Sequence, residues 1–435
     1  MTPFGKAVSR SALGIAMAAG LAAGFSAPAT AQRQPKAESV SPGFGKVAAP
    51  FQKAVADAKT RPNVVAAKGN PAALSAALAP EKAQFEAMMA AAATPVDKYN
   101  AGALALGLGQ LAEDPAILRR GLTIMIESGK TPPADLPRLN FFLGQTAFQA
   151  KDYAAAQTAL QAAVSGGYRD NDADALLAQA YISDNKAQQG LTILRQAMDA
   201  KRAAGVVPPQ NWYRAGLGAA YRGKLLDQAA FFSIGLAQHY PTKENWAGAI
   251  TVVRDIAKYP AQENLDLLRL MGRTNSFMEE RDYIEYIQAA DARRFPGEVL
   301  SVINTGTTAG KLRAADPFIT EARTIANGRV AADRASLPTL ERDARAPNAS
   351  AATVTAAADT FLSYGQAAKA AELYTIAQTK PGADLPRVLT RLGIAQVDSG
   401  NYAGAQATFA KVTGPRKSMA DLWAIYAQQK AAGKA

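Results

Sequence analysis

A pattern that recurs three times between residues 138 and 242 constrains this chain more than any other feature of its sequence. Each copy has an apolar residue followed by glycine or alanine, a third residue three positions later, and then a small and a large apolar residue in a second predicted helix. The copies are Leu143, Gly144, Ala147, Ala156 and Leu160; Leu177, Ala178, Tyr181, Gly190 and Leu194; and Leu217, Gly218, Tyr221, Ala230 and Ile234. The small residues of the second helices are 34 and 40 positions apart, a period typical of helical repeat arrays.

The composition agrees with an ordered, helical chain. Apolar residues make up 49% of the sequence and charged residues 19%, which is not a disordered composition. Alanine, the best helix former, dominates, and no segment shows the alternation typical of strands. The small residues predict that the two helices of each copy cross closely, because a larger side chain would hold them apart.

Related patterns lie on both sides of the three copies. A degenerate copy precedes them, two clearer copies follow near the C-terminus, and residues 243–345 keep helical spacing without the signature. The residues of these outer copies are Leu108, Gly109, Gly121 and Met125; Ala357, Ala358, Phe361, Ala370, Tyr374 and Ala377; and Leu392, Gly393, Ala405 and Phe409. A last helix with Trp423 and Tyr426 is expected to cap the array.

The pattern resembles the tetratricopeptide repeat (TPR), with L-G-x-x-Y in one helix, A-x-x-x-F in the next and Pro241 at the exit of the third copy. The resemblance covers residues 97–242 and 351–415 well and 243–345 poorly. The N-terminal segment, the string Phe44-Gly-Lys-Val47 and the string from Ala410 to Arg416 are similar to exported TPR proteins of alphaproteobacteria, a group without an assigned activity. The resemblance implies an all-α, right-handed superhelical solenoid of TPR-like repeats, about eight helical pairs long, that binds proteins or peptides.

The first 31 residues have the design of a secretory signal peptide. Lys6 and Arg10 precede an apolar stretch over residues 11–25, and Ala29-Thr30-Ala31 forms a small-residue cleavage site. The alternative is an uncleaved anchor helix. We therefore expect a periplasmic protein that is not an integral membrane protein. The expected organisation is a signal peptide (1–31), a basic, proline-containing tether with one docking helix (32–70), a TPR-like array that is irregular from 243 (71–345), and C-terminal repeats with a capping helix (346–435).

The net charge of +12 lies mainly at the two ends of the chain. Residues 32–70 carry seven basic and two acidic groups, and residues 346–435 carry nine and five. A nucleic-acid-binding protein is expected to show a basic stripe with interleaved aromatic residues, and this chain does not. The basic ends either serve solubility only or make weak contact with anionic envelope polymers, and both alternatives stay open.

No catalytic or metal-binding constellation emerges from the sequence. There is no cysteine, and His239 is the only histidine, which excludes thiolate sites and multi-histidine metal sites. Asp170, Asp172 and Asp174 have the opening spacing of a calcium loop, but alanine and tyrosine stand where it requires glycine and glutamate. We therefore predict no enzyme activity, no metal and no cofactor.

The predicted working surface is the concave face formed by the first helices of the repeats. Its candidate residues combine aromatic and arginine anchors with amide donors, as peptide-binding grooves do: Arg138, Phe141, Gln145, Phe148, Gln179, Trp212 and Arg222. The alternative is that Phe141, Phe148 and Trp212 only pack against neighbouring helices. The predicted function is a non-enzymatic scaffold that binds a protein or peptide. The alternative is an envelope-polysaccharide or peptidoglycan binder, or an accessory of a glycan-acting enzyme.

Overall fold

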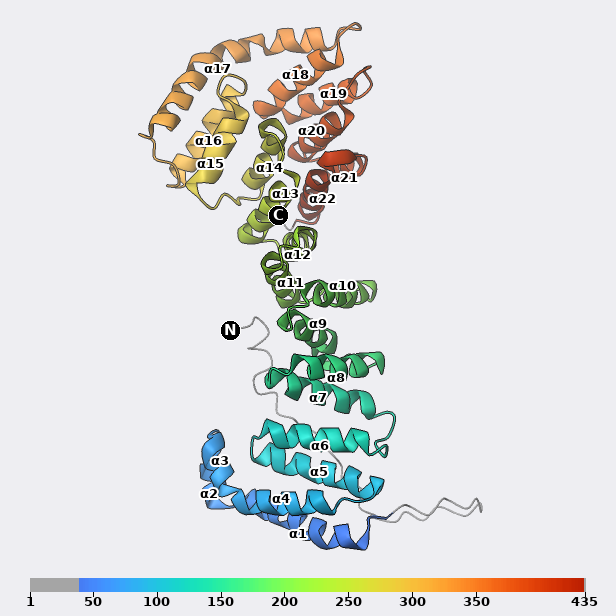
Figure 1. Ribbon diagram of the computed structural model, residues 1–435. Helices are drawn as coiled ribbons and strands as arrows, with labels where there is room; N and C mark the ends of the chain where they lie inside the picture. The colour runs from blue at the N-terminus through green and yellow to red at the C-terminus, as the bar shows by residue number, and fades with distance from the viewer. Residues whose placement is uncertain (1–38, 434–435) are drawn as a thin grey trace, which may run out of the picture. The chain divides into compact units, whose positions relative to one another are not determined.

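The computed structural model describes residues 39–433, and every regular element in that range is a helix (Figure 1). The predicted signal peptide lies outside the described residues. The chain divides between Pro208 and Pro209 into two compact units. Unit 1 is the part before this point and unit 2 the part after it. The predicted limits at residues 70 and 345 do not coincide with this division and stay predictions.

Unit 1 consists of ten α-helices within its described residues. They are α1 (Pro42–Ala58), α2 (Pro62–Ala66), α3 (Pro71–Ala77), α4 (Ala79–Ala91), α5 (Pro95–Leu111), α6 (Pro115–Glu127), α7 (Leu136–Gln149), α8 (Tyr153–Ser165), α9 (Ala173–Ser183) and α10 (Ala187–Ala203). From α5 onward they form three consecutive antiparallel hairpins, each packed on the next. The apolar clusters of this unit are separate and are formed by helices that are close in sequence.

Unit 2 contains twelve α-helices within its described residues. They are α11 (Gln210–Arg222), α12 (Leu226–His239), α13 (Lys243–Ala257), α14 (Ala261–Arg273), α15 (Glu280–Ala290), α16 (Pro296–Thr308), α17 (Pro317–Ala344), α18 (Ala351–Ser363), α19 (Ala367–Ala377), α20 (Leu385–Asp398), α21 (Tyr402–Phe409) and α22 (Lys417–Ala431). The C-terminal helix α22 packs against α12, α13, α14 and α20 (Figure 1). One continuous apolar core therefore extends from α12 to α22, and the irregular residues 243–345 belong to it.

The same turn joins the two helices of eight hairpins in the described residues. The second residue after the first helix is left-handed. The N–H of the third residue after the helix donates to the carbonyl five residues before it, as in a Schellman motif. The left-handed residues are Glu113, Lys151, Asn185, Lys224, Asn275, Gly310, Gly365 and Gly400. The structure thus confirms an all-α, TPR-like array of helical hairpins. The expected hand of the superhelix stays a prediction.

Close helix crossings explain the small residues of the repeats. A Cβ added to Gly144 in α7 would lie 2.5 Å from Cγ and 3.0 Å from the backbone nitrogen of Leu160 in α8. A Cβ at Gly190 in α10 would lie 2.6 Å from the carbonyl oxygen of Ala178 in α9. Gly393 in α20 is covered by the ring of Phe409 in α21. These pairs confirm the expected close crossing in the first and second copies, and the last copy has a crossing of the same kind.

The third copy is in a different register from the predicted one. The residue at its crossing is Gly216, which lies under the ring of Phe232, whereas a Cβ at Gly218 would meet only the tip of Arg222 at 3.5 Å. The copy that the sequence defines by Gly218 and Ile234 is therefore two positions out of register with the helix crossing in the structure. The sequence misleads here because both positions hold glycine, and only the place of the large ring of Phe232 selects between them.

The described part of the predicted tether is folded into unit 1. Phe44, Phe51 and Val55 of α1 are buried against α4 and α5, as expected for a docking helix. The segment that follows is also held, because the guanidinium of Arg61 donates two bonds of 3.0 Å to the buried carboxylate of Glu81.

In unit 1 the first helices of the hairpins are much more buried than the second helices. No residue of α9 is exposed, and in α7 Gln149 is the exposed residue. In contrast, α8 exposes Ala154, Thr158, Gln161, Ala162 and Ser165. The array therefore has an inner row, α5, α7 and α9, and an outer row, α6, α8 and α10.

Candidate functional site

Three of the predicted concave-face residues are buried. Phe141 is 1% exposed and packs on Tyr168 with ring centroids 4.9 Å apart. Trp212 is 1% exposed, and Gln179 is 6% exposed with its amide donating to Ser183 Oγ. Phe141 and Trp212 therefore pack against neighbouring helices, which is the alternative stated for them above, because a buried side chain presents no surface to a partner.

Three other candidates lie together on the inner row of unit 1. Arg138, Gln145 and Phe148 are half-buried on α7 at spacings of seven and three residues, which places them on one side of the helix. Arg138 bonds to Asp135 at 3.3 Å, and the ring of Phe148 lies 5.6 Å from that of Tyr153. Arg222 is exposed on α11. It belongs to unit 2, so the structure does not join it to this group.

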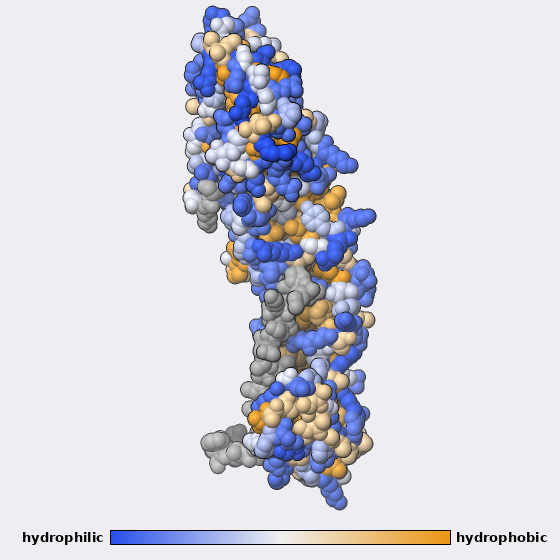
Figure 2. Space-filling view, turned by 90° about the vertical axis from the view of Figure 1, so that its left-hand side faces the viewer, coloured by the Kyte–Doolittle hydropathy of each residue, from blue (hydrophilic) through white to orange (hydrophobic). Residues whose placement is uncertain are grey.

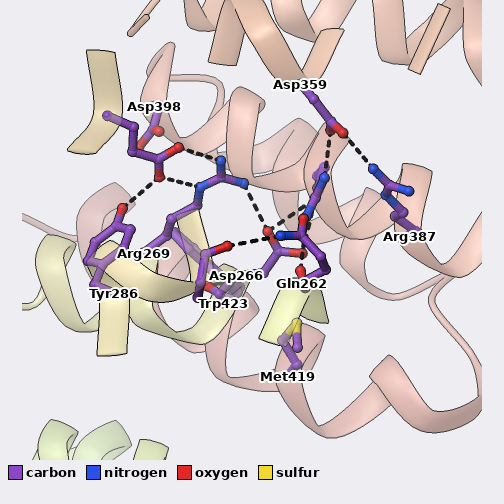
Figure 3. A network of polar contacts seen from close by, with 12 residues as sticks. Gln262, Asp266, Arg269, Tyr286, Asp359, Arg387, Asp398, Met419 and Trp423 are labelled. Atoms are coloured by element: carbon purple, nitrogen blue, oxygen red, sulfur yellow. Dashed lines mark hydrogen bonds and ion pairs between the residues drawn. The ribbon is translucent and has the colours of Figure 1, made fainter. Parts of the chain in front are cut away.

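The most unusual feature of unit 2 is a buried network of ion pairs centred on Asp266 of α14 (Figure 3). This carboxylate is 0% exposed and accepts bonds from Arg269 at 3.0 Å, Arg391 at 3.1 Å and Arg416 at 2.9 Å. The backbone carbonyl of Asp266 also accepts the indole N–H of Trp423 at 2.9 Å. The network therefore ties α14 to α20 and α22, which come 125 to 157 residues later.

Two further buried carboxylates complete the network. Glu298 of α16 accepts two bonds of 2.7 Å from Arg269 and one of 2.8 Å from the Tyr286 hydroxyl. A third carboxylate, Asp359 of α18, accepts from the Tyr374 hydroxyl at 2.5 Å, from Arg387 at 2.5 Å and forms an ion pair of 2.7 Å with Arg391. Every one of these carboxylates thus has at least two donors, as burial of a charge requires.

Electrostatics keep these carboxylates ionised. Burial by itself raises the pKa of Asp266, but the charges of Arg391, Arg269 and Arg416 outweigh it and lower this pKa to about 2. Glu298 and Asp359 show the same balance, with burial opposed by arginines and a net lowered pKa. Burial raises the pKa values of the Tyr286 and Tyr374 hydroxyls well above the usual value of a tyrosine. Both hydroxyls therefore stay protonated and act as donors.

Next to this network lies a pocket of about 390 Å³, within the range of small-molecule sites. Helices α14, α15, α16 and α18 form it together with the middle of α17 and the α14–α15 and α18–α19 turns. Its charged lining residues are Arg269, Arg273, Glu298 and Arg334. Its other principal lining residues are Asn275, Phe277, Tyr283, Tyr286, Ser301, Thr305, Ser363 and Tyr364.

The sequence did not point to this site. Its residues come from the part of the chain where the repeat signature is weakest, and the partners of Asp266 are far away in the chain. The only local signal is in α14, where Asp266 and Arg269 lie among the leucines of residues 265–270, so that charged residues occupy positions of an otherwise apolar, buried segment. Within residues 39–433 no group of three or more His, Cys, Asp or Glu side chains is placed to hold a metal ion. No helix of that range has the length and apolar character needed to cross a membrane.

Comparison with known proteins adds little to this description. No protein-family model matches the chain, and no curated protein matches it in sequence. Among solved structures, the chain is similar to one described as "Structure of Naa15/Naa10 bound to HypK-THB", with 12% identity, coverage of 89% of this chain and 70% of that chain, and a TM-score of 0.25. A likeness at this TM-score carries no argument about function.

Proposed function

We propose that the chain is a non-enzymatic scaffold that binds a protein or peptide in the bacterial periplasm through the inner row of unit 1. The observation that carries the proposal is the half-exposed group of Arg138, Gln145 and Phe148 on α7. It combines a cation, an amide and an aromatic ring, and aromatic and arginine residues are enriched among those that contribute most to binding energy in interfaces.

A site-specific photocrosslinker tests which row is used. Placed at Gln145 of the inner row, it is expected to trap a discrete partner from envelope extract. At Gln161 of the outer row, on an exposed face of the neighbouring helix, it is expected to trap none. Equal trapping at both positions would contradict the proposal.

A matched pair of variants then measures the contribution of the group. We expect Arg138→Ala with Phe148→Ala to weaken capture of the partner at least tenfold, which corresponds to about 1.4 kcal/mol. Thr158→Ala with Gln161→Ala on the outer row is the control. Phe141→Ala and Trp212→Ala are unsuitable, since both side chains are in the core. If the mature chain traps no protein but is retained on purified sacculi until salt is added, the envelope-polymer alternative replaces the proposal.

Export is tested separately from binding. Residues 1–38 fused to a reporter enzyme that is active only outside the cytoplasm are expected to give activity, and N-terminal sequencing of the exported chain is expected to begin at Gln32. An unprocessed N-terminus would favour the anchor-helix alternative, and an inactive reporter would contradict the periplasmic location.

A further inference from the structure

The pocket of unit 2 has an unbalanced set of charges and donors. Three arginines and one glutamate line it. Both oxygens of Glu298 are occupied by Arg269 and Tyr286, so this carboxylate offers little to a ligand. Arg273 is held by Asp398 through Nε and Nη2, at 2.8 and 2.7 Å. Arg269, Arg273 and Glu298 are therefore already paired within the protein.

Arg334 is the lining cation that has no ion pair within 4 Å in the described chain. Its guanidinium carbon lies 5.5 Å above the ring of Tyr364, and the side chain is exposed at the edge of the pocket on α17. The nearest acidic neighbour in sequence, Asp333, is 3.5 Å from the Tyr364 hydroxyl. Burial, followed by Asp333, raises the pKa of Tyr364 to about 12, so this phenol adds no negative charge that would compete for Arg334.

Two hydroxyl groups of the pocket can only accept a further hydrogen bond. Thr305 Oγ1 donates its proton to the Ser301 carbonyl at 2.9 Å, and Ser363 Oγ donates to the Thr360 carbonyl at 2.8 Å. A hydroxyl whose proton is committed to a backbone carbonyl can only accept a further bond. A ligand that carries O–H groups would satisfy these acceptors, whereas an anion without protons would not.

Aromatic side chains form part of the pocket wall and are packed against their neighbours. Phe277 packs on Tyr283 with ring centroids 4.6 Å apart. A Cβ at Gly297 of α16 would lie 2.5 Å from the Tyr364 ring, so glycine is what lets this ring approach α16.

Hydrophilic residues predominate on the face of unit 2 seen in Figure 2, with apolar residues scattered among them.

From these contacts we infer that the pocket between α14, α16, α17 and α18 binds a small hydroxylated organic acid, with its carboxylate on Arg334 and its hydroxyl groups on Thr305 and Ser363. The pocket volume of about 390 Å³ suits a ligand of monosaccharide size. The inference does not depend on the inner row of unit 1, because it uses residues of unit 2 only.

Calorimetric titration of the full mature chain with matched ligands tests the inference. The probes are glucuronate and gluconate, their uncharged counterparts glucose and sorbitol, and inorganic sulfate as a charge without hydroxyl protons. We expect both carboxylates to bind at least ten times more tightly than the uncharged counterparts and than sulfate. Equal binding of sulfate would show an unspecific anion site and overturn the inference, and so would equal binding of glucose or the absence of binding by either acid.

Two variants and a control assign the binding to this pocket. Arg334→Gln is expected to weaken glucuronate binding about tenfold, and Thr305→Val to weaken it several-fold without changing sulfate binding. Arg342→Gln removes an exposed cation from the same helix and is expected to have no effect. Because all three positions are exposed, the variants are expected to keep the thermal stability of the wild type. Unchanged binding in Arg334→Gln would contradict the inference.

Discussion

The two units of this protein are built from similar hairpins but are stabilised over different distances along the chain. In unit 1 the apolar clusters are local, and each is formed by helices that lie close in sequence. In unit 2 one core extends over α12 to α22, and ion pairs join residues 125 and 150 positions apart. Because arrays with nearest-neighbour contacts can open piece by piece, we expect unit 1 to unfold in steps and unit 2 to unfold as a whole.

The largest effect is expected from Asp266→Asn. The change leaves the guanidinium groups of Arg269, Arg391 and Arg416 without the charge that they share, and breaking a buried ion pair typically costs about 3–5 kcal/mol. Hydrogen exchange is expected to accelerate throughout α12–α22 and to stay unchanged in α5–α10. As a control, Asp421→Asn removes an exposed partner of Lys417 and is expected to change stability by less than about 1 kcal/mol. Acceleration confined to α14 would show that unit 2 is as modular as unit 1.

A local change in unit 1 is expected to stay local. In Gly144→Ala the new methyl group would lie 3.0 Å from the backbone nitrogen of Leu160, and overpacking of this kind costs about 1–3 kcal/mol. We expect faster hydrogen exchange in α7 and α8 but not in α5. Gly107→Ala is the matched control, because its Cβ would lie 4.0 Å from Val55, and helix propensity predicts a gain of about 0.5–1 kcal/mol. Destabilisation by both changes would contradict the close-crossing explanation.

Acid is expected to act on the network of unit 2. The Asp266 carboxylate has a pKa of about 2 in the folded chain against 3.8 ordinarily, so it binds fewer protons in the folded than in the unfolded state. Its contribution, about 2 kcal/mol, is therefore present above pH 4 and is lost as the pH falls from about 4 to 2.

Tryptophan fluorescence can follow this acid transition in unit 2 alone. All three tryptophans, Trp212, Trp246 and Trp423, lie in that unit. In urea titrations monitored by fluorescence, the free energy of unfolding is expected to fall less between pH 4 and pH 2 in Asp266→Asn than in the wild type. An identical decrease in both proteins would show that other carboxylates set the acid sensitivity.

Smaller effects are expected from two single hydrogen bonds of α22, beginning with Trp423→Phe. This change removes the indole N–H that donates to the Asp266 carbonyl at 2.9 Å, and such a bond contributes about 1 kcal/mol net. The free energy of unfolding measured in urea by circular dichroism is expected to fall by about 1–2 kcal/mol, since some packing is lost as well. Tyr426→Phe, which loses a half-buried bond of 3.1 Å to the Arg273 carbonyl, is expected to cost less. A larger loss in Tyr426→Phe would reverse this order.

Prediction from the sequence was reliable where the signal was local and unambiguous. In the pairs Gly144 with Leu160 and Gly393 with Phe409, the two residues are 16 positions apart, and each pair joins the two helices of its own hairpin. The third copy was placed two residues out of register, because Leu217, Gly218 and Tyr221 match the pattern, whereas the structure has Gly216 at the crossing with Phe232. On the predicted concave face, helical spacing grouped Arg138, Phe141, Gln145 and Phe148, and the structure leaves all of them but Phe141 half-buried. Spacing did not reveal that Tyr168 covers Phe141, since that contact depends on how the chain leaves α8.

By itself, the sequence determined the helical class and the hairpin unit, because the contacts that define a hairpin fall within one repeat and recur with its period. Tertiary structure alone decided which carboxylates are buried and which arginines pair with them. Asp266 is one of 36 acidic residues, and 48 basic residues are available to the chain. The pairing of Asp266 with Arg391 and Arg416 does not recur with the repeat, because it depends on the packing of α20 and α22 against α14. The pocket beside the network follows from the same long-range packing.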